Sequence, residues 1–166
     1  MSFKGVSIMD RAYEFRIYPN REQRQLIART FGCVRLVYNH YLDKKKQLWQ
    51  DGRMSLSYND CAKDLTQLKK EKEFLKEVDS IALQQSLRHL DRAYQNFFKN
   101  RCGYPQLRKK HAKQSYRTMN VNGNIQIDGD TIKLPKAGSV KIVNTRDFKG
   151  RIINATVSRT PSGRYY

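Results

Sequence analysis

A stretch rich in Lys and Arg and free of acidic side chains has the clearest chemical potential in this sequence. No Asp or Glu occurs between Arg92 and Ile127. The cations of this window that we assign to phosphate contacts are Arg101, Arg108, Lys109, Lys110, Lys113 and Arg117. Ammonium and guanidinium groups bind phosphate oxygens, whereas an ordinary solvated surface mixes both signs of charge. The window therefore predicts a connector that binds a nucleic-acid backbone, with a plain solvated surface as the alternative.

Ring-bearing side chains lie among these cations. Tyr104, His111 and Tyr116 are spread through the window. Flat rings of this kind stack on unpaired bases of single-stranded nucleic acids. They also pin loops to the body of a protein, and the sequence favours neither interpretation. Tyr104 and Tyr116 are our candidate base-stacking residues.

A second basic group lies upstream, at Lys44, Lys45 and Lys46, with Arg35 on the same predicted helix. A cationic helix face of this kind suits the backbone of a duplex. Exposed helical lysines also commonly serve solubility alone. Lys44 and Lys45 are therefore candidate backbone contacts, with a solvated helix face as the competing interpretation.

The sequence contains no recognisable centre for catalysis or for a metal ion. His40, His89 and His111 stand singly, without a companion at ligand spacing. The three cysteines include no C-x-x-C pair, which argues against a zinc knuckle and a disulfide framework and favours a reducing cytoplasm. Turn geometry explains the two aspartates that flank Gly129. We expect no catalytic residue, metal ion or cofactor in this chain.

Positive charge dominates the composition. The 166 residues include 33 Lys or Arg and 15 Asp or Glu, which gives a formal net charge of +18 and a pI near 10.0. Such self-repulsion is tolerable when a polyanion neutralises it, so nucleic acid is the predicted partner class. The length allows one domain or two small intertwined lobes. No window approaches the roughly 18 apolar residues of a membrane helix and no signal peptide is present, so we expect a soluble protein.

The elements that would position these side chains begin with a strand and continue with helices. Apolar alternation over 12–18 predicts the strand. A capping box at Asn20 begins a long helix, and Ser57 begins a second. Beyond Asp79, apolar residues spaced by 4, 3, 4 and 3 predict a third helix. Three helices should therefore form a bundle between about residues 20 and 100.

The helical period disappears near residue 101, and β-like runs take over. Residues 125–134 are typical of a hairpin, with further strands at 140–143 and 151–159 and a turn at 160–163. The first strand would be isolated unless it joined these strands, and closure removes the edges of a sheet. We infer an α+β fold, in which a small β-barrel is interrupted after its first strand by the helical bundle.

Short phrases along the chain occur in a recognisable order. In the first half they are 15–20 (FRIYPN), 31–42 (FGCVRLVYNHYL), 82–87 (ALQQSL) and 94–98 (YQNFF). In the second half they are 103–110 (GYPQLRKK), 115–118 (SYRT) and 132–135 (IKLP). Together they resemble the TnpB family of insertion-sequence OrfB proteins over nearly the whole chain.

Members of that family are RNA-guided DNA endonucleases related to type V CRISPR effectors. The resemblance implies a wedge-type, OB-like barrel interrupted by a helical recognition lobe, followed by a RuvC-like nuclease domain with acidic metal ligands and a zinc element. The segments expected here are 1–19 for the first part of the wedge barrel, 20–100 for the lobe, 101–123 for the basic connector and 124–166 for the rest of the barrel. Because the nuclease domain would follow residue 166, Mg²⁺ and Zn²⁺ are expected only there, and we do not expect this chain to cut DNA.

The resemblance also implies residues that read a short DNA motif beside the target. The matching positions are Tyr58, Gln84, Ser115 and Asn122. The departures are Ala62, Ser80 and Val121, so the motif read here differs or is lost. Ring packing in the bundle is the alternative for Tyr58, exposure to water for Gln84, and turn hydrogen bonding for Ser115.

Two functions follow, and they belong to different classes. The leading one is a nucleic-acid-binding part that holds a guide RNA from the transposon end and double-stranded target DNA, in the nucleoid of a prokaryotic cytoplasm. The alternative is part of a complete Mg²⁺-dependent endonuclease whose nuclease domain lies outside this chain. A nuclease-dead DNA-binding regulator is a variant of the first.

Overall fold

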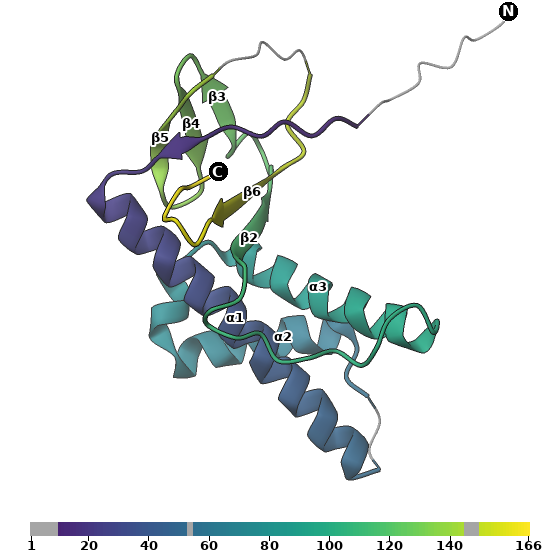
Figure 1. Ribbon diagram of the computed structural model, residues 1–166. Helices are drawn as coiled ribbons and strands as arrows, with labels where there is room; N and C mark the ends of the chain where they lie inside the picture. The colour runs from purple at the N-terminus through teal and green to yellow at the C-terminus, as the bar shows by residue number, and fades with distance from the viewer. Residues whose placement is uncertain (1–9, 53–54, 145–149) are drawn as a thin grey trace, which may run out of the picture.

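The computed structural model describes residues 10–52, 55–144 and 150–166, which form a helical part and a β part (Figure 1). The chain begins with β1 (Ile17–Tyr18) and continues through α1 (Arg21–Gln50), α2 (Tyr58–Glu71), the 3₁₀ helix η1 (Glu73–Lys76) and α3 (Ser80–Phe98). The strands that follow are β2 (Gln114–Met119), β3 (Gln126–Asp128), β4 (Thr131–Leu134), β5 (Gly138–Ile142) and β6 (Asn154–Arg159). The prediction of an α+β fold with three α-helices after the first strand is confirmed.

Side-chain caps begin all three α-helices, and two of them, Asn20 and Ser57, are the caps that the sequence predicted. At α1, Asn20 Oδ1 accepts a hydrogen bond from the Gln23 N–H at 2.9 Å, and Gln23 Oε1 accepts one from the Asn20 N–H at 3.0 Å. Ser57 and Asp60 form the same capping box at α2. Asp79 caps α3 by accepting from an N–H of its first turn. Each cap is worth about 1 kcal/mol.

The cap of α1 also attaches the helical part to the β part. Gln23 Nε2 donates to the carbonyl oxygens of Ala137 at 3.1 Å and Ser139 at 2.8 Å. These carbonyls lie at and just before β5, which pairs with β1. The beginning of α1 is therefore bonded to the sheet that it leaves.

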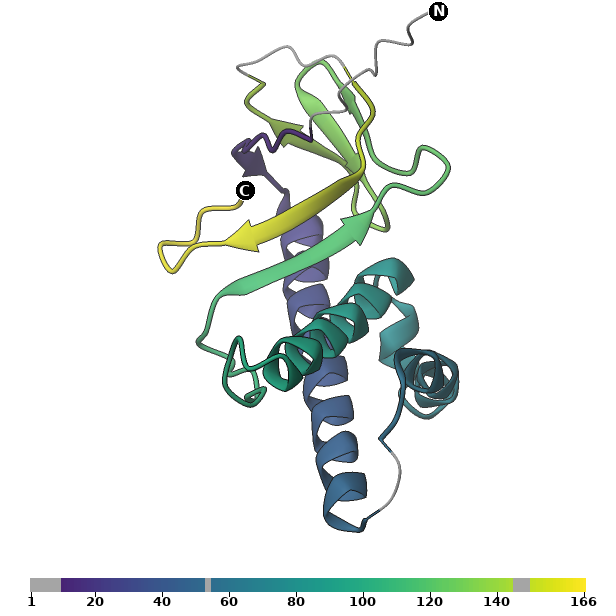
Figure 2. The same cartoon turned by 90° about the vertical axis from the view of Figure 1, so that its right-hand side faces the viewer.

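The helices pack around one apolar core in which α3 crosses α1 (Figure 2). The face of α3 that carries Leu83, Leu87 and Leu90 is buried, as its spacing predicted. Burial of each such leucine stabilises the fold by about 1.5–3 kcal/mol. The Ser86 hydroxyl, also buried, donates to the Val34 carbonyl of α1 at 2.6 Å. Among the described helices, none is long and apolar enough to cross a membrane.

The strands form two antiparallel sheets, one of four strands in the order β1-β5-β4-β3 and one of two strands, β2-β6. The predicted hairpin is confirmed, with Ile127 opposite Ile132 and Gly129 at φ +52° in the turn. Tyr165 connects the two sheets, because it forms bridges with both Ile17 of β1 and Arg159 of β6. The Ile17 N–H donates to the Tyr165 carbonyl at 3.0 Å. The residues after the 160–163 turn therefore reach the first strand.

The predicted closed barrel is wrong, because no ladder pairs β3 with β2 among the described residues. After β2 the chain turns through Asn122 and Gly123, both at positive φ, and this turn carries it away from a pairing register. A side chain spans the opening instead. Asn120 Nδ2 donates to the Ile152 carbonyl at 2.8 Å, and Asn120 Oδ1 accepts from the Ile125 N–H at 3.2 Å.

Two predicted segments differ from the observed elements. The first strand is two residues long instead of covering 12–18, because its partner β5 ends at Ile142 and the last bond runs from the Val143 N–H to the Arg16 carbonyl. The predicted connector 101–123 contains a complete strand, β2, which pairs with β6 over six residues. The basic segment is therefore partly a rigid element of the fold.

Candidate nucleic-acid interface

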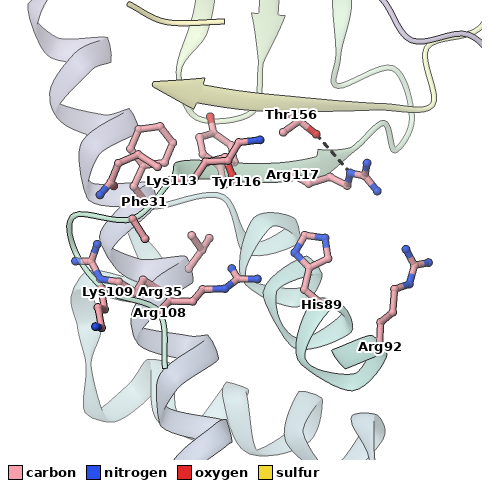
Figure 3. Close-up of a pocket in the computed structure, with 14 residues that line it drawn as sticks. Phe31, Arg35, His89, Arg92, Arg108, Lys109, Lys113, Tyr116, Arg117 and Thr156 are labelled. Carbon is pink, nitrogen blue, oxygen red and sulfur yellow. Dashed lines mark hydrogen bonds between the residues drawn. The ribbon is translucent and has the colours of Figure 1, made fainter. Parts of the chain in front are cut away.

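A cationic pocket lies where β2 passes over α1 and α3 (Figure 3). Its volume is about 520 Å³, and its walls come from α1, α3, the segment 108–113, β2 and β6. The cations that line it are Arg35, Arg92, Arg108, Lys109, Lys113 and Arg117, and none of its lining residues is Asp or Glu. We call this site the basic pocket. Six cations without a counter-charge in the lining give this pocket a positive potential, which attracts anions.

The segment that carries Arg108 is fastened to α1 by one asparagine. Asn39 Oδ1 accepts from the Arg108 N–H at 2.8 Å, and Asn39 Nδ2 donates to the Arg108 carbonyl at 3.0 Å. The Arg108 guanidinium carbon lies 3.9 Å from the ring centroid of Tyr38. Burial lowers the pKa of Arg108 while Tyr38 opposes this shift, and a guanidinium remains charged in proteins. The backbone and the side chain of Arg108 are therefore both held in place.

The strand β2 is positioned from below by its buried side chains. The ring of Tyr116 lies 5.8 Å from the ring of Phe31 on α1. The Thr118 hydroxyl donates to the carboxylate of Asp79, the residue that caps α3. Tyr116 and its neighbours Ser115 and Arg117 all line the basic pocket. Arg117 Nε also donates to Thr156 Oγ1 at 3.4 Å.

One imidazole lies among these cations. His89 projects from α3 into the basic pocket, with Arg108 on one side, Arg92 on the other and Arg117 on the strand above (Figure 3). Burial lowers the pKa of His89, and the positive charges of Arg108, Arg117 and Arg92 lower it further. Both causes favour the neutral form of the ring.

The structure brings together part of the predicted site. Arg108, Lys109, Lys113 and Arg117 line the basic pocket together with Ser115. Arg101 and Lys110 are exposed but do not line it. With Arg92, at which it begins, the positively charged window of the sequence is thus the source of five of the six cations.

The sequence grouped Arg35 with a basic face of the first helix and placed Arg92 at the start of the acid-free window, but it gave His89 no role in binding. Arg35 follows Phe31 by one helical turn, and His89 and Arg92 are one turn apart on α3. These spacings assign each residue to a helix face. The two faces meet under β2 only in the tertiary structure, so no local sequence pattern could predict it.

The predicted backbone contacts on α1 are engaged within the protein. Lys44 Nζ forms an ion pair with Asp64 Oδ2 at 2.9 Å. Lys45 is 7% exposed, and its ammonium lies 5.0 Å from the ring centroid of Tyr94. The prediction that Lys45 contacts a backbone is wrong for this conformation, because Tyr94 of α3 covers it. The alternative of a solvated lysine face is equally wrong for this residue.

The two predicted stacking residues have different environments. Tyr116 is 6% exposed and packs on Phe31, so the prediction that its ring stacks on a base is wrong. Tyr104 is 38% exposed. Its ring makes edge contacts with Tyr94 and Phe97, and its hydroxyl lies 2.9 Å from that of Tyr94. Tyr104 is therefore part of an aromatic cluster that reaches the surface.

Three of the four predicted motif-reading residues lie outside the basic pocket. Tyr58 is half-buried at the start of α2, with the Arg88 guanidinium carbon 4.7 Å from its ring centroid. Gln84 is exposed one helical turn before Arg88, so it lies on the same face of α3. Asn122 is exposed in the turn after β2, at φ +54°. Ser115 is the member of this set that lines the basic pocket.

Within residues 10–52, 55–144 and 150–166, no group of three or more His, Cys, Asp or Glu side chains is arranged to hold a metal ion. The Asp64 carboxylate accepts a hydrogen bond from the Tyr41 hydroxyl and forms an ion pair with Lys44. The Asp79 carboxylate accepts a hydrogen bond from the Thr118 hydroxyl, so both carboxylates are engaged in contacts within the fold.

Two curated relatives match almost the whole chain. One is "Putative RNA-guided DNA endonuclease" of Streptomyces pristinaespiralis, 35% identical over 160 residues, which cover 94% of this chain and 40% of the relative. The other is "Putative RNA-guided DNA endonuclease InsQ" of Escherichia coli (strain K12), 31% identical over 159 residues, which cover 93% of this chain and 39% of the relative. The chain thus spans about two fifths of the length of these relatives.

A third relative has nearly all of its length inside the match. "Virulence protein VsdF" of Salmonella dublin is 39% identical over 116 residues, which cover 63% of this chain and 98% of that protein.

A family profile for a helix-turn-helix domain of OrfB proteins (HTH_OrfB_IS605) matches residues 9–54. In the structure, the described part of this segment contains β1 and the single unbroken helix α1, so it does not form two helices joined by a turn. The domain name therefore describes the family and not the local geometry. With this profile and these relatives, the resemblance seen in the sequence is confirmed, and the chain belongs to the TnpB family of insertion-sequence OrfB proteins.

Proposed function

We propose that this chain binds nucleic acid, with the basic pocket as the site that holds the phosphate backbone of a guide RNA. The observation that carries this proposal is the convergence of six cations from α1, α3 and the segment 108–117 on one pocket without an acidic residue. Phosphodiesters are anionic throughout the neutral pH range and supply the missing counter-charge. The names of the two longer relatives support RNA and DNA as the partners.

The proposed contact with DNA involves another face of α3, which carries Gln84 and Arg88. Gln84 is exposed near the start of that helix, and Tyr58 lies close by through its contact with Arg88. A glutamine amide has the donor and acceptor needed to pair with an adenine edge in a major groove. We assign Tyr58 and Gln84, with Asn122 and Ser115, to the reading of a DNA motif beside the target.

In this proposal the described residues bind and do not hydrolyse. The family names of the longer relatives favour a second candidate, in which a protein that contains this chain cuts DNA under RNA guidance. Any Mg²⁺ and Zn²⁺ sites would then belong to a nuclease domain outside residues 10–166. Both candidates need the basic pocket for the same purpose, which makes it the first site to test.

The test is the salt dependence of RNA binding after three charges have been removed from the basic pocket. We expect Lys109→Gln/Lys113→Gln/Arg117→Gln to weaken binding of a single-stranded RNA. Each lost phosphate contact removes about 0.7 from the slope of log affinity against log salt, so the slope should flatten by about 2 units. Fluorescence anisotropy over a series of salt concentrations measures both quantities.

The matched control removes the same charge elsewhere. Lys63, Lys70 and Lys76 are exposed on α2 and η1 and do not line the basic pocket. Their combined change to Gln also lowers the formal net charge of +18 by three. If the control flattens the slope as much as the pocket variant, binding follows net charge alone and the assignment of the pocket is wrong.

The aromatic cluster gives a second, smaller test that is specific for unpaired bases. Tyr104→Ala should cost about 1 kcal/mol in binding of single-stranded RNA and nothing on duplex RNA, because only an unpaired base can stack on its ring. Tyr116→Phe, which keeps the buried ring, is the control. An equal loss on single and double strands would show that Tyr104 acts by holding the fold.

A further inference from the structure

The charged surroundings of His89 are unusual for a half-buried imidazole. The titratable groups that line the basic pocket with it are Arg35 of α1, Arg92 of α3, Arg108, Lys109 and Lys113 of the segment 108–113, and Tyr116 and Arg117 of β2. The acidic residues of α3 are engaged away from the ring. Asp91 accepts from Gln95 at 2.7 Å, and Asp79 accepts from Thr118. No carboxylate therefore favours the protonated form of His89.

Two forces keep this ring neutral in the empty pocket. Burial removes water that would solvate an imidazolium, and this is the larger cause of the lowered pKa of His89. The charges of Arg108, Arg117 and Arg92 repel an additional proton. An entering phosphate offsets both effects although the ring stays buried, because its negative charge screens the arginines and attracts the imidazolium.

We propose that His89 is a phosphate ligand that takes up a proton as the basic pocket is filled, so that nucleic acid and hydrogen ion bind together. The inference rests on the proposed function and specifies its chemistry. The proton comes from the solvent and adds to the free ring nitrogen of His89. The imidazolium N–H then donates to a phosphate oxygen held by Arg92, Arg108 and Arg117, and no covalent bond changes.

The sign of the resulting pH dependence is fixed by linkage. The free protein has the lower pKa and the complex the higher one, so the complex carries more protons between these two values. Affinity must then rise as the pH falls through that interval. A single coupled proton limits the slope to about tenfold in affinity per pH unit.

The experiment is isothermal titration calorimetry of the whole chain with a thymidine oligonucleotide that lacks terminal phosphates, between pH 5 and 8 at constant ionic strength. Thymine does not titrate in this range, and a phosphodiester lacks the second pKa of about 6 that a phosphomonoester has. Repeating each titration in buffers of different ionisation enthalpy counts the protons taken up. We expect proton uptake near the pKa of His89, up to one per bound oligonucleotide.

His89→Asn should abolish most of this uptake and flatten the dependence of affinity on pH. The control is His40→Asn. His40 also has a lowered pKa through burial, but it lies on α1 beside a separate hollow lined by Asp43, Lys44 and Gln47. This control should leave the uptake unchanged. Circular dichroism establishes that both variants fold.

Each possible result decides the matter. Binding without proton uptake, or uptake that survives in folded His89→Asn, overturns the role of His89 and leaves the proposed function intact. Absence of any binding overturns the inference, while the RNA titrations of the pocket variant decide the proposed function separately. If His89→Asn does not fold, the imidazole of the wild-type protein is followed by NMR, and a pKa of His89 that does not rise on addition of the oligonucleotide overturns the inference.

Discussion

Asp79→Ala is expected to lower the free energy of unfolding by about 2 to 4 kcal/mol, because one carboxylate serves two elements. One oxygen accepts from the Ile81 N–H at 2.9 Å and caps α3, and the other accepts from the Thr118 hydroxyl of β2. Asp79 is 7% exposed and Thr118 is fully buried. The alanine variant therefore loses a helix cap and leaves a buried hydroxyl without its acceptor.

Urea unfolding followed by far-UV circular dichroism measures this loss, and two further variants identify its cause. Asp79→Asn keeps an acceptor for the cap and a group that can bond to Thr118, so it should cost less than Asp79→Ala. In a double-mutant cycle, Thr118→Val should cost much less in the Asp79→Ala background than alone. Additive costs would show that the two side chains act independently, contrary to the structure.

Asn39→Ala is expected to release the segment 104–113 from α1 without unfolding the protein. The variant removes both hydrogen bonds to the backbone of Arg108, at 2.8 and 3.0 Å, and leaves a partly buried N–H and carbonyl unpaired. A cost of about 2 kcal/mol corresponds to about a thirtyfold larger population of the open segment. Amide hydrogen exchange resolved by mass spectrometry measures this change in peptides that cover the segment.

Gln106→Ala is the matched control, because Gln106 belongs to the same segment but donates only to the carbonyl of Tyr104 within it. It should leave the exchange of the segment almost unchanged. We also expect Asn39→Ala to weaken RNA binding although it removes no charge, since Arg108 and Lys109 then lose their fixed positions. Normal protection of the segment in Asn39→Ala would show that other contacts hold it.

The helices could be predicted from the sequence because their signals are local. Asn20 with Gln23, Ser57 with Asp60, and Asp79 each satisfy backbone groups within three residues of themselves, so the same bonds form whatever surrounds the helix. The hairpin around Gly129 was predictable for the same reason. In these places the cause of the structure is contained in a short window.

The errors concern residues whose environment is supplied by distant parts of the chain. Lys45 is buried because Tyr94 arrives from another helix, and Tyr116 because Phe31 lies beneath its strand. The strand itself was missed, since its alternation of Tyr116 and Thr118 with Ser115 and Arg117 is short and lies inside a basic stretch. Membership in the basic pocket depends on such crossings, which is why its α1 and α3 walls were not predicted.

The bridge between Ile17 and Tyr165 has a consequence for the order of events during synthesis. A ribosome releases the chain from its N-terminus, so Ile17 emerges long before the residue to which it is bonded. The three helices contact mostly one another, so they can pack while the partner of the first strand at Tyr165 has not yet been synthesised. Because Tyr165 emerges after every described strand, its bridge to Ile17 forms later than the pairing of those strands can begin, and a nascent chain stalled before Tyr165 should hold a formed bundle and a first strand without this bridge.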